Sequence, residues 1–267
     1  MLKKLRRLIG NVIRHRNPLD VAHYEVNLGL KEQLVIAQVS DVHIPRSAFS
    51  PKVIADAVAK EKPDIIVITG DMMDGRSKFH GPHLSQLIQL LKKIAPVYAI
   101  SGNHERNNRK YFKIWRTMLK LSGVHYLDNA IHTFKKGEQR FTIVGIADYN
   151  PQKIDQLDLQ FLEGLQSKQD DCILLLHHKP NIWRNIYPPH LPLPQLVFSG
   201  HAHGGQVMLP ILNRGLIAPG EGIIPKYVNG LYAYPDGTME LISRGLASST
   251  RPVRVNNRPH LPIVTLK

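Results

Sequence analysis

The chain has 267 residues, of which 43% are hydrophobic, and its formal net charge is +14 at pH 7. The length suits one layered domain, the single Cys172 excludes a disulfide framework, and no stretch approaches the about 18 consecutive apolar residues of a transmembrane helix. The basic balance indicates an anionic partner, such as a phosphorylated substrate, a nucleic acid or an anionic lipid surface.

Residues 1–17 form a separate, strongly basic segment. They contain six Lys and Arg residues and no acid, and the apolar side chains from Leu2 to Ile13 follow helical spacing. This pattern predicts an amphipathic helix that lies on an anionic membrane surface, and the interspersed charges argue against a secretory signal peptide. The alternative is that this helix packs on the rest of the protein. We expect residues 18–267 to form one further domain.

Strands alternate with helices in the first half of that domain. We expect paired strands at 24–28 and 34–39, a helix capped by Ser50, a buried strand before Asp71, a helix over 82–94, a strand over 97–100 and a helix closing near Gly123. This alternation predicts an α/β core in which adjacent strands are parallel.

The second half of the sequence is richer in short strands. Apolar runs at 131–134 and 141–146 flank a polar turn and predict a hairpin, and a helix around 154–165 should precede a strand at 172–176. After Gly205, short strands alternate with Gly and Pro turns, and we expect them at 206–209, 231–234, 239–243 and 263–266.

Polar residues that can bind a metal ion follow several of the expected strands directly. They are acids, imidazoles and one amide: Asp41, His43, Asp71, Asn103, His104, His177 or His178, His201 and His203. We expect these strand ends to build one site with Asp71 at its centre. Nitrogen and oxygen donors without thiolate suit Mn, Fe, Zn or Co, and the number of donors fits two ions that share a carboxylate and clamp a phosphoryl group.

The complete series resembles the calcineurin-like metallophosphoesterase superfamily. Its motifs read Asp41-Val-His43, Gly70-Asp71-Met-Met-Asp74, Gly102-Asn-His-Glu105, the His177-His178 pair and Gly200-His-Ala-His203. Asp74 stands where the purple acid phosphatase branch has a tyrosine, which argues against that branch. The resemblance implies an α/β fold, a four-layer α-β-β-α sandwich of two mixed sheets flanked by helices.

The resemblance also implies a role for each site residue. One divalent ion would be held by Asp41, His43, Asp71 and His203, and a second by Asp71, Asn103, His178 and His201, so that Asp71 bridges both. We choose His178 over His177 because His178-Lys-Pro180 matches the family's His-x-Pro run. His104 would assist departure of the leaving oxygen, and a hydroxide bridging the ions, with Mn favoured, would be the nucleophile.

The C-terminal region narrows the resemblance to a bacterial, membrane-associated subgroup related to UDP-2,3-diacylglucosamine pyrophosphatases of lipid A biosynthesis. Its matching stretches are 200–207, 243–246, 251–254 and 258–259, whereas Ala247 and His260 replace the glycine and glutamate usual in the subgroup. The candidates for binding an anionic substrate are Arg244, Arg251 and Arg254, although each could equally be a structural ion-pair partner.

We therefore expect a dinuclear metallophosphoesterase that hydrolyses a phosphoester or pyrophosphate bond. The substrate would be lipid-linked or membrane-proximal, such as UDP-2,3-diacylglucosamine, and the enzyme would lie peripherally on the cytoplasmic face of the bacterial inner membrane. One alternative is a soluble phosphodiesterase acting on nucleotides or nucleic acid, although no stacking platform for specific nucleic-acid binding is evident. The other is a non-catalytic metal-binding scaffold, although no ligand of the motif series is missing.

Overall fold

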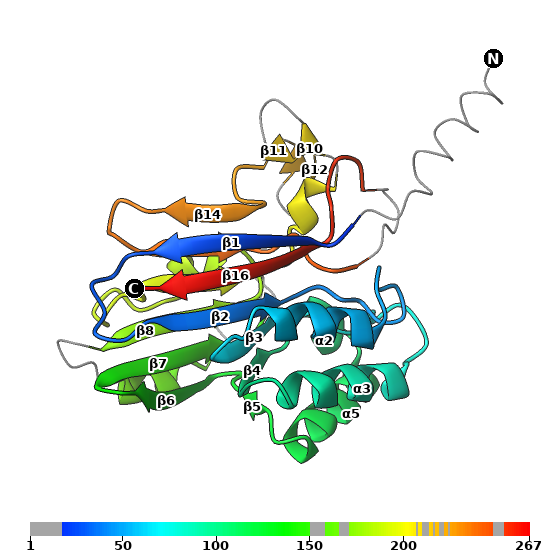
Figure 1. Cartoon of the computed structure of the whole chain (residues 1–267), viewed down its shortest axis with the longest axis horizontal. Coiled ribbons are helices and arrows are strands. Elements are labelled where there is room, and N and C mark those ends of the chain that lie inside the picture. The colour runs from blue at the N-terminus through cyan, green and yellow to red at the C-terminus, as the bar shows by residue number, and fades with distance from the viewer. Residues whose placement is uncertain are drawn as a thin grey trace.

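Two mixed six-stranded sheets pack face to face in the computed structural model (Figure 1), which describes residues 18–149, 158–165, 171–206, 208–209, 214–215, 217–218, 222–223, 225–247 and 254–267. The first sheet contains, in spatial order, β1 (Asp20–Val26), β16 (His260–Leu266), β2 (Leu34–Val39), β3 (Ile65–Thr69), β4 (Val97–Ile100) and β5 (His125–Tyr126). The second contains β14 (Gly230–Ala233), β15 (Met239–Ile242), β9 (Leu196–Ser199), β8 (Cys172–His177), β7 (Gln139–Ile146) and β6 (Ala130–Lys136).

The remaining described elements are helices and two short hairpins. The α-helices are α2 (Pro51–Lys60), α3 (Gly81–Lys92), α4 (Asn103–Arg106) and α5 (Arg109–Leu121), and the 3-10 helices are η2 (Gln160–Gly164), η3 (Ile182–Asn185) and η4 (His203–Gly205). The hairpins pair β10 (Met208–Leu209) with β11 (Arg214–Gly215), and β12 (Ile217–Ala218) with β13 (Gly222–Ile223).

The central strands β2, β3 and β8 are mostly apolar, as is expected of strands that are covered on both faces. On β3, Ile66 and Ile68 face the cluster beneath the helices, whereas Ile65 and Val67 face the second sheet. Alternate residues of β8 divide in the same way between the space separating the sheets and the outer face of the second sheet. The apolar runs seen in the sequence therefore belong to strands buried on both sides.

Helices cover the outer faces of both sheets, which confirms the predicted layers. On the first sheet lie α2, α3 and α5, and the fully buried Trp115 anchors α5. Ser50 caps α2, as expected, by accepting a hydrogen bond from the Val53 amide at 3.4 Å. On the second sheet, η2 and η3 cover the outer face. Of the helix expected over 154–165, residues 154–157 lie outside the described residues, and the part from 160 to 164 is the 3-10 helix η2.

The expected pairing of the first two strands is wrong. β1 runs parallel to β16, and β16 lies between β1 and β2, antiparallel to β2 (Figure 1). The segment predicted only as a short strand at 263–266 is thus an interior strand of seven residues, almost all of them buried. Apolar residues on both faces make β16 suited to this interior position, which sequence neighbours alone do not reveal.

Each sheet contains a set of parallel strands, and the carboxyl ends of both sets lie at the same edge of the sandwich. In the first sheet β2, β3 and β4 are parallel, and in the second β7, β8 and β9 are parallel. β3 and β8 also contact each other across the sheets. The carboxyl ends of both sets therefore deliver their following residues to a common region. Among the described residues, no helix has the length and apolar character required to cross a bilayer.

His260 on β16 should make folding sensitive to acid. Its Nδ1 accepts a hydrogen bond from the Arg244 amide at 3.2 Å, and its Nε2 lies 3.3 Å from the Tyr24 hydroxyl. Burial and then the charges of Arg244 and Arg254 hold the pKa of His260 well below its usual range. Above the unfolded-state pKa, His260 is neutral in both states and does not affect the free energy of unfolding. As the pH falls below that pKa, the unfolded chain binds a proton that the folded protein does not, so the free energy of unfolding decreases.

We expect His260→Gln to reduce this acid sensitivity, because an amide can replace both hydrogen bonds without titrating. Between pH 7 and pH 5 the free energy of unfolding, measured in urea, should fall by about 2 kcal/mol more in the wild type than in the variant. Equal losses in the two proteins would contradict this account of His260.

Candidate metal centre

Three groups of potential metal ligands lie at the converging strand ends, and in each the donor atoms all lie within 4.8 Å of one another. The two that contain the predicted ligands, called here the two ligand groups, are Asp41, His43 and His203, and Asp71, His178 and His201; the third joins His43 to Asp74 and His104. The Asp71 carboxylate connects them, because its Oδ2 is 3.6 Å from His43 Nε2 and 3.3 Å from His178 Nε2. Asp71 thus occupies the central position that the strand pattern predicts.

The orientation of His178 shows why a cation fits the second group. Its Nδ1 lies 2.7 Å from the Thr69 carbonyl oxygen, which can only accept, so Nδ1 carries a proton. In the neutral imidazole, Nε2 then presents a lone pair toward Asp71 Oδ2 and toward Asn103 Oδ1 at 3.1 Å. Three acceptors that face one another need a bound cation or an extra proton between them.

The charges in the site lead to the same conclusion. Burial opposes protonation of His178, yet the neighbouring Asp71 carboxylate outweighs it and raises the pKa of His178 to about 10. Burial lowers the pKa of His201 to about 4 and that of His203 to about 3, so these imidazoles are neutral, as metal ligands must be. The site therefore combines buried carboxylates with two neutral imidazoles, and a metal ion would replace the extra proton that Asp71 draws to His178.

Backbone conformation at the site is unusual for residues other than glycine. Left-handed φ angles of such residues cost about 1–3 kcal/mol each and cluster at functional sites. Ten described non-glycine residues have positive φ, and half of them belong to the two ligand groups: Asp41 (49°), His43 (49°), Asp71 (52°), His201 (63°) and His203 (48°). The fold thus holds the ligand side chains in place through sharply turned backbone.

Two glycines allow the loops after β3 and β4 to approach closely. A side chain on Gly70, whose φ is +94°, would lie 2.6 Å from the Gly102 amide nitrogen and 2.7 Å from His178 Nδ1. A side chain on Gly102 would collide with the Asp71 carboxylate. The glycines of the two motifs therefore leave the space in which Asp71 and His178 meet.

Glu105 fastens these loops to each other, a role that the sequence reasoning missed. Its fully buried carboxylate accepts hydrogen bonds from the amides of Asp71 at 2.8 Å, Gly102 at 2.8 Å and Met73 at 3.0 Å. Burial and the nearby Asp71 charge raise the pKa of Glu105 to about 7. The only signal in the sequence was its place as the last residue of the Gly-Asn-His-Glu motif.

His104 lies beside the ligand groups and is oriented by two acids. Its backbone amide donates to Asp71 Oδ1 at 2.8 Å, and its Nδ1 is 3.1 Å from Asp74 Oδ1. Asp74 is itself held by Arg46 Nε at 2.9 Å and by the Ser77 hydroxyl at 2.7 Å. The His104 side chain is 17% exposed, whereas the Asp71 side chain is 2% exposed. His104 is therefore positioned to meet a molecule that arrives from solvent.

The structure separates the two consecutive histidines. His178 lies between Asp71 and Asn103, whereas the buried His177 directs its Nδ1 to the Lys179 carbonyl oxygen at 2.8 Å. His177 belongs to neither ligand group of the described residues. Burial lowers its pKa to about 4. This geometry agrees with the choice of His178 as the candidate ligand.

Two of the three arginines proposed for substrate binding have structural partners. The Arg244 guanidinium pairs with the Asp20 carboxylate and donates to Asn229 Oδ1 at 2.5 Å. Arg254 is also buried, donating to the Arg244 carbonyl oxygen at 2.7 Å, and its Nη2 lies 3.4 Å from His203 Nδ1. The geometry thus favours the structural alternative for both residues, with Arg254 behind a candidate ligand, while Arg251 lies outside the described residues.

Comparison with known proteins gives a consistent result. A model of the calcineurin-like phosphoesterase family matches residues 34–205. The uncharacterized metallophosphoesterase YkoQ of Bacillus subtilis is 27% identical over 257 residues, which cover 92% of this chain and 91% of the relative. Phosphodiesterase YaeI of Escherichia coli is 27% identical over 266 residues, which cover 96% and 87%. Among solved structures, TT1561 of Thermus thermophilus is 11% identical with a TM-score of 0.47, over 80% of this chain and 91% of that chain.

The family match covers more than half of the chain and includes every residue of the two ligand groups. It begins at Leu34, the first residue of β2, and ends at Gly205, the last residue of η4. Metallophosphoesterases use divalent metal ions, which agrees with the convergent carboxylate and imidazole donors. The chain therefore belongs to the calcineurin-like phosphoesterase family and is a phosphoester hydrolase.

Proposed function

We propose that the protein hydrolyses phosphodiester or pyrophosphate bonds with two divalent metal ions, of which manganese is the favoured choice. The observation that carries this proposal is the position of Asp71 between two donor groups. Asp41, His43 and His203 would hold one ion, His178, His201 and Asn103 would hold the other, and Asp71 would contact both. When bound, such ions activate water and neutralise charge on the phosphoryl oxygens.

The residues of the chain have distinct tasks in this proposal. The ligands fix the positions at which the phosphoryl oxygens bind, and Glu105 keeps the Asp71 and Asn103 loops together through three backbone hydrogen bonds. The Gly75 amide donates to His104 Nδ1 at 3.1 Å, so the neutral imidazole carries its proton on Nε2, which would donate a hydrogen bond or a proton to the leaving-group oxygen. His104 and Asp71 are the catalytic residues of this proposal.

We further propose that the substrate is lipid-linked or membrane-proximal, with UDP-2,3-diacylglucosamine as a representative. The basic amphipathic sequence of residues 1–17 and the C-terminal motifs support this choice, and the relative YaeI carries the name phosphodiesterase. The protein would then lie on the cytoplasmic face of the inner membrane, with residues 1–17 on anionic lipid. Incubation with nucleotide-linked lipids and with free nucleotides, with products identified by mass, separates this proposal from a soluble nucleotide phosphodiesterase.

Asp71→Asn should lower hydrolysis of bis(p-nitrophenyl) phosphate by at least about 100-fold in the presence of Mn²⁺, because one carboxylate serves both donor groups. The same variant should retain less metal after dialysis, measured by elemental analysis. The matched control is Asp56→Asn on the exposed face of α2, which should behave as the wild type. Near-normal turnover by Asp71→Asn would contradict the shared role of Asp71.

His104→Gln should lower kcat by about 10²–10⁴-fold without loss of metal, because His104 acts on the leaving group and is not a ligand in this proposal. Asp74→Asn should lower kcat in the same direction but less, since it only loosens the orientation of His104. The exposed His190→Gln is the control. Metal loss that parallels the activity loss would instead make His104 a ligand.

Deletion of residues 1–17 should weaken binding to vesicles that contain phosphatidylglycerol, because six cations are removed, and should leave hydrolysis of a soluble diester unchanged. Vesicle co-sedimentation and the diester assay measure the two effects. If the shortened chain fails to fold, the alternative in which this segment packs on the protein is correct.

A further inference from the structure

The excess positive charge of the chain is concentrated in two segments. Residues 1–17 hold six Lys and Arg residues, and residues 76–127 hold ten, with Glu105 as the only acid in either segment. All other residues together contain 19 Lys and Arg against 20 Asp and Glu. Glu105 is fully buried and bound to backbone amides, so it does not offset the surface charge of residues 76–127.

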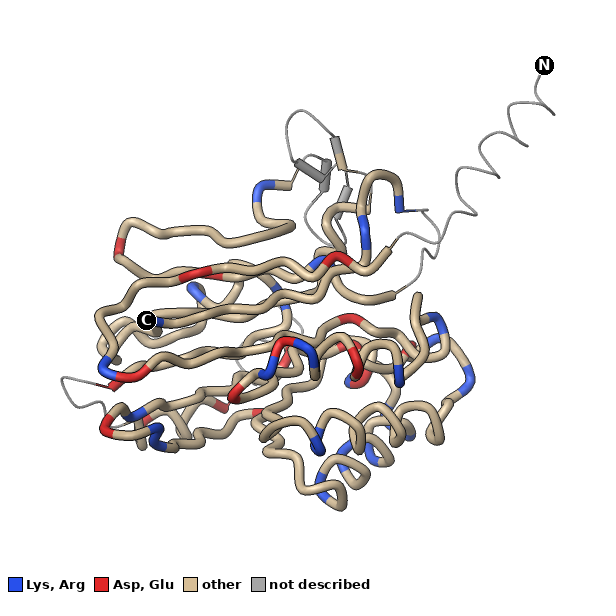
Figure 2. The backbone as a smooth tube through the Cα atoms, viewed as in Figure 1, with Lys and Arg blue, Asp and Glu red and all other residues tan. Residues whose placement is uncertain are grey.

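Helix α5 displays much of this second concentration on its solvent face. Five of its thirteen residues are basic, and all five are exposed: Arg109, Lys110, Lys113, Arg116 and Lys120. Figure 2 shows Lys and Arg positions along α5 with no Asp or Glu among them. No described carboxylate lies within ion-pair distance of Lys110, Lys113 or Lys120. The charges of this face are therefore available to an anionic partner.

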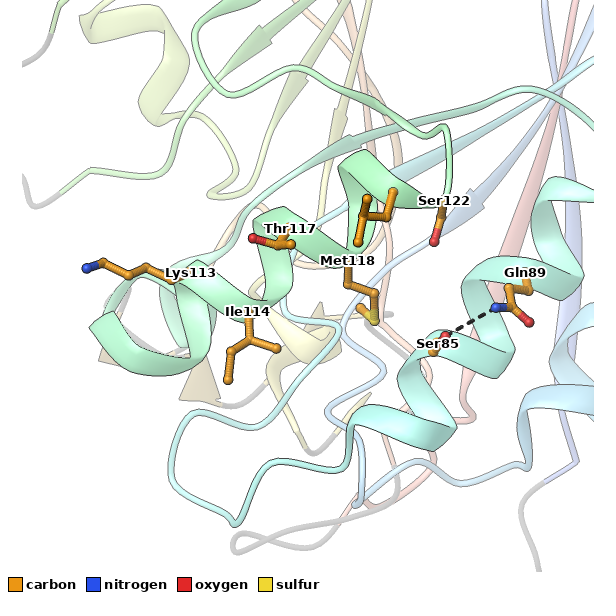
Figure 3. A pocket seen from close by; sticks show the side chains of 8 residues that line it. Ser85, Gln89, Lys113, Ile114, Thr117, Met118 and Ser122 are labelled. Atoms are coloured by element: carbon orange, nitrogen blue, oxygen red, sulfur yellow. Dashed lines mark hydrogen bonds between the residues drawn. The ribbon is translucent and has the colours of Figure 1, made fainter.

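Apolar side chains lie next to these cations. Leu121 is 82% exposed and Ile114 is 41% exposed, so α5 carries two of the five large hydrophobic side chains that are exposed among the described residues. Ile114 and Met118 line an open groove of about 730 Å³ between α5 and α3, whose lining contains Ser85 and Gln89 but no acid. Figure 3 shows Met118 pointing toward Ser85 on α3, whereas Lys113 points away from α3.

We propose that the α5 surface, defined as the exposed side of α5 together with its groove against α3, docks onto a bilayer that contains anionic phospholipid. Basic side chains beside exposed aliphatic ones match headgroup phosphates over a hydrocarbon layer. A single-stranded nucleic acid would need exposed aromatic rings on which its bases could stack. The Arg116 guanidinium lies over the rings of Phe112 and Tyr126, the aromatic residues near this surface. This contact is additional to residues 1–17 and does not depend on the identity of the substrate.

Docking through α5 would also place the metal centre near the bilayer. α4 carries Asn103 and the partly exposed His104, and α5 begins three residues after α4 ends. Since Trp115 and Leu119 are fully buried against the first sheet, α5 is fixed relative to the catalytic loops. The α5 surface therefore orients the whole domain, whereas a single N-terminal segment would only tether it.

A charge-reversal experiment on the full-length chain tests the electrostatic part. Lys113→Glu combined with Lys120→Glu should weaken binding to phosphatidylcholine vesicles containing phosphatidylglycerol by at least about 10-fold, since each Lys near an anionic surface contributes about 1 kcal/mol. Lys60→Glu combined with Lys135→Glu, two exposed positions on α2 and β6, makes the same change in net charge elsewhere and should weaken binding much less. Diester hydrolysis should be unchanged in both proteins and shows that they are folded.

A fluorescent label tests the contact itself, independently of residues 1–17. The only native cysteine, Cys172, is buried, so Leu121→Cys can be labelled selectively with an environment-sensitive dye. Its emission should shift to the blue on anionic vesicles, whereas a dye at Leu193→Cys, also an exposed leucine, should not respond. Equal binding of the two charge-reversal proteins, or no shift at position 121, would overturn the proposal. The proposal would also be overturned, in favour of nucleic acid, if the protein bound an oligonucleotide more tightly than vesicles and the Lys113/Lys120 variant lost this binding.

Discussion

The buried carboxylate of Asp71 is the feature on which the rest of the site depends. One oxygen lies close to both His43 and His178, and the other accepts the amide of His104. Burial raises the free energy of a charged carboxylate, and neighbouring imidazoles or bound cations must offset it. Because the Nδ1 proton of His178 is held by the Thr69 carbonyl, Asp71 can be stabilised on this side only by a second proton on Nε2, as the raised pKa of His178 indicates, or by a bound metal ion.

The backbone around Asp71 adopts unfavourable conformations that keep the ligand side chains in position. Asp71 and four further members of the ligand groups have left-handed φ angles, and Gly70 and Gly102 permit an approach that any side chain would block. Glu105 then joins the two loops with hydrogen bonds to three amides. The parallel strands bring the ligands to one edge, and these local constraints determine which way the side chains point.

Much of this site could be predicted because its signals are local in sequence. Each ligand follows an apolar run directly, and parallel strands buried on both faces carry such runs to a common edge. Contacts between distant segments could not be predicted in the same way. The position of β16 between β1 and β2 joins the two ends of the chain, and the Arg244–Asp20 pair spans the same separation. The contact between Asp74 and His104 depends on how two loops fold over each other.

The central claim is that two metal ions share Asp71, and anomalous diffraction tests it most directly. Crystals grown with Mn²⁺ and measured at the manganese absorption edge should show two peaks about 3.5–4 Å apart, on either side of the Asp71 carboxylate. One peak would lie among Asp41, His43 and His203, and the other among His178, His201 and Asn103. A single peak remote from Asp71, or no peak at these side chains, would contradict the account.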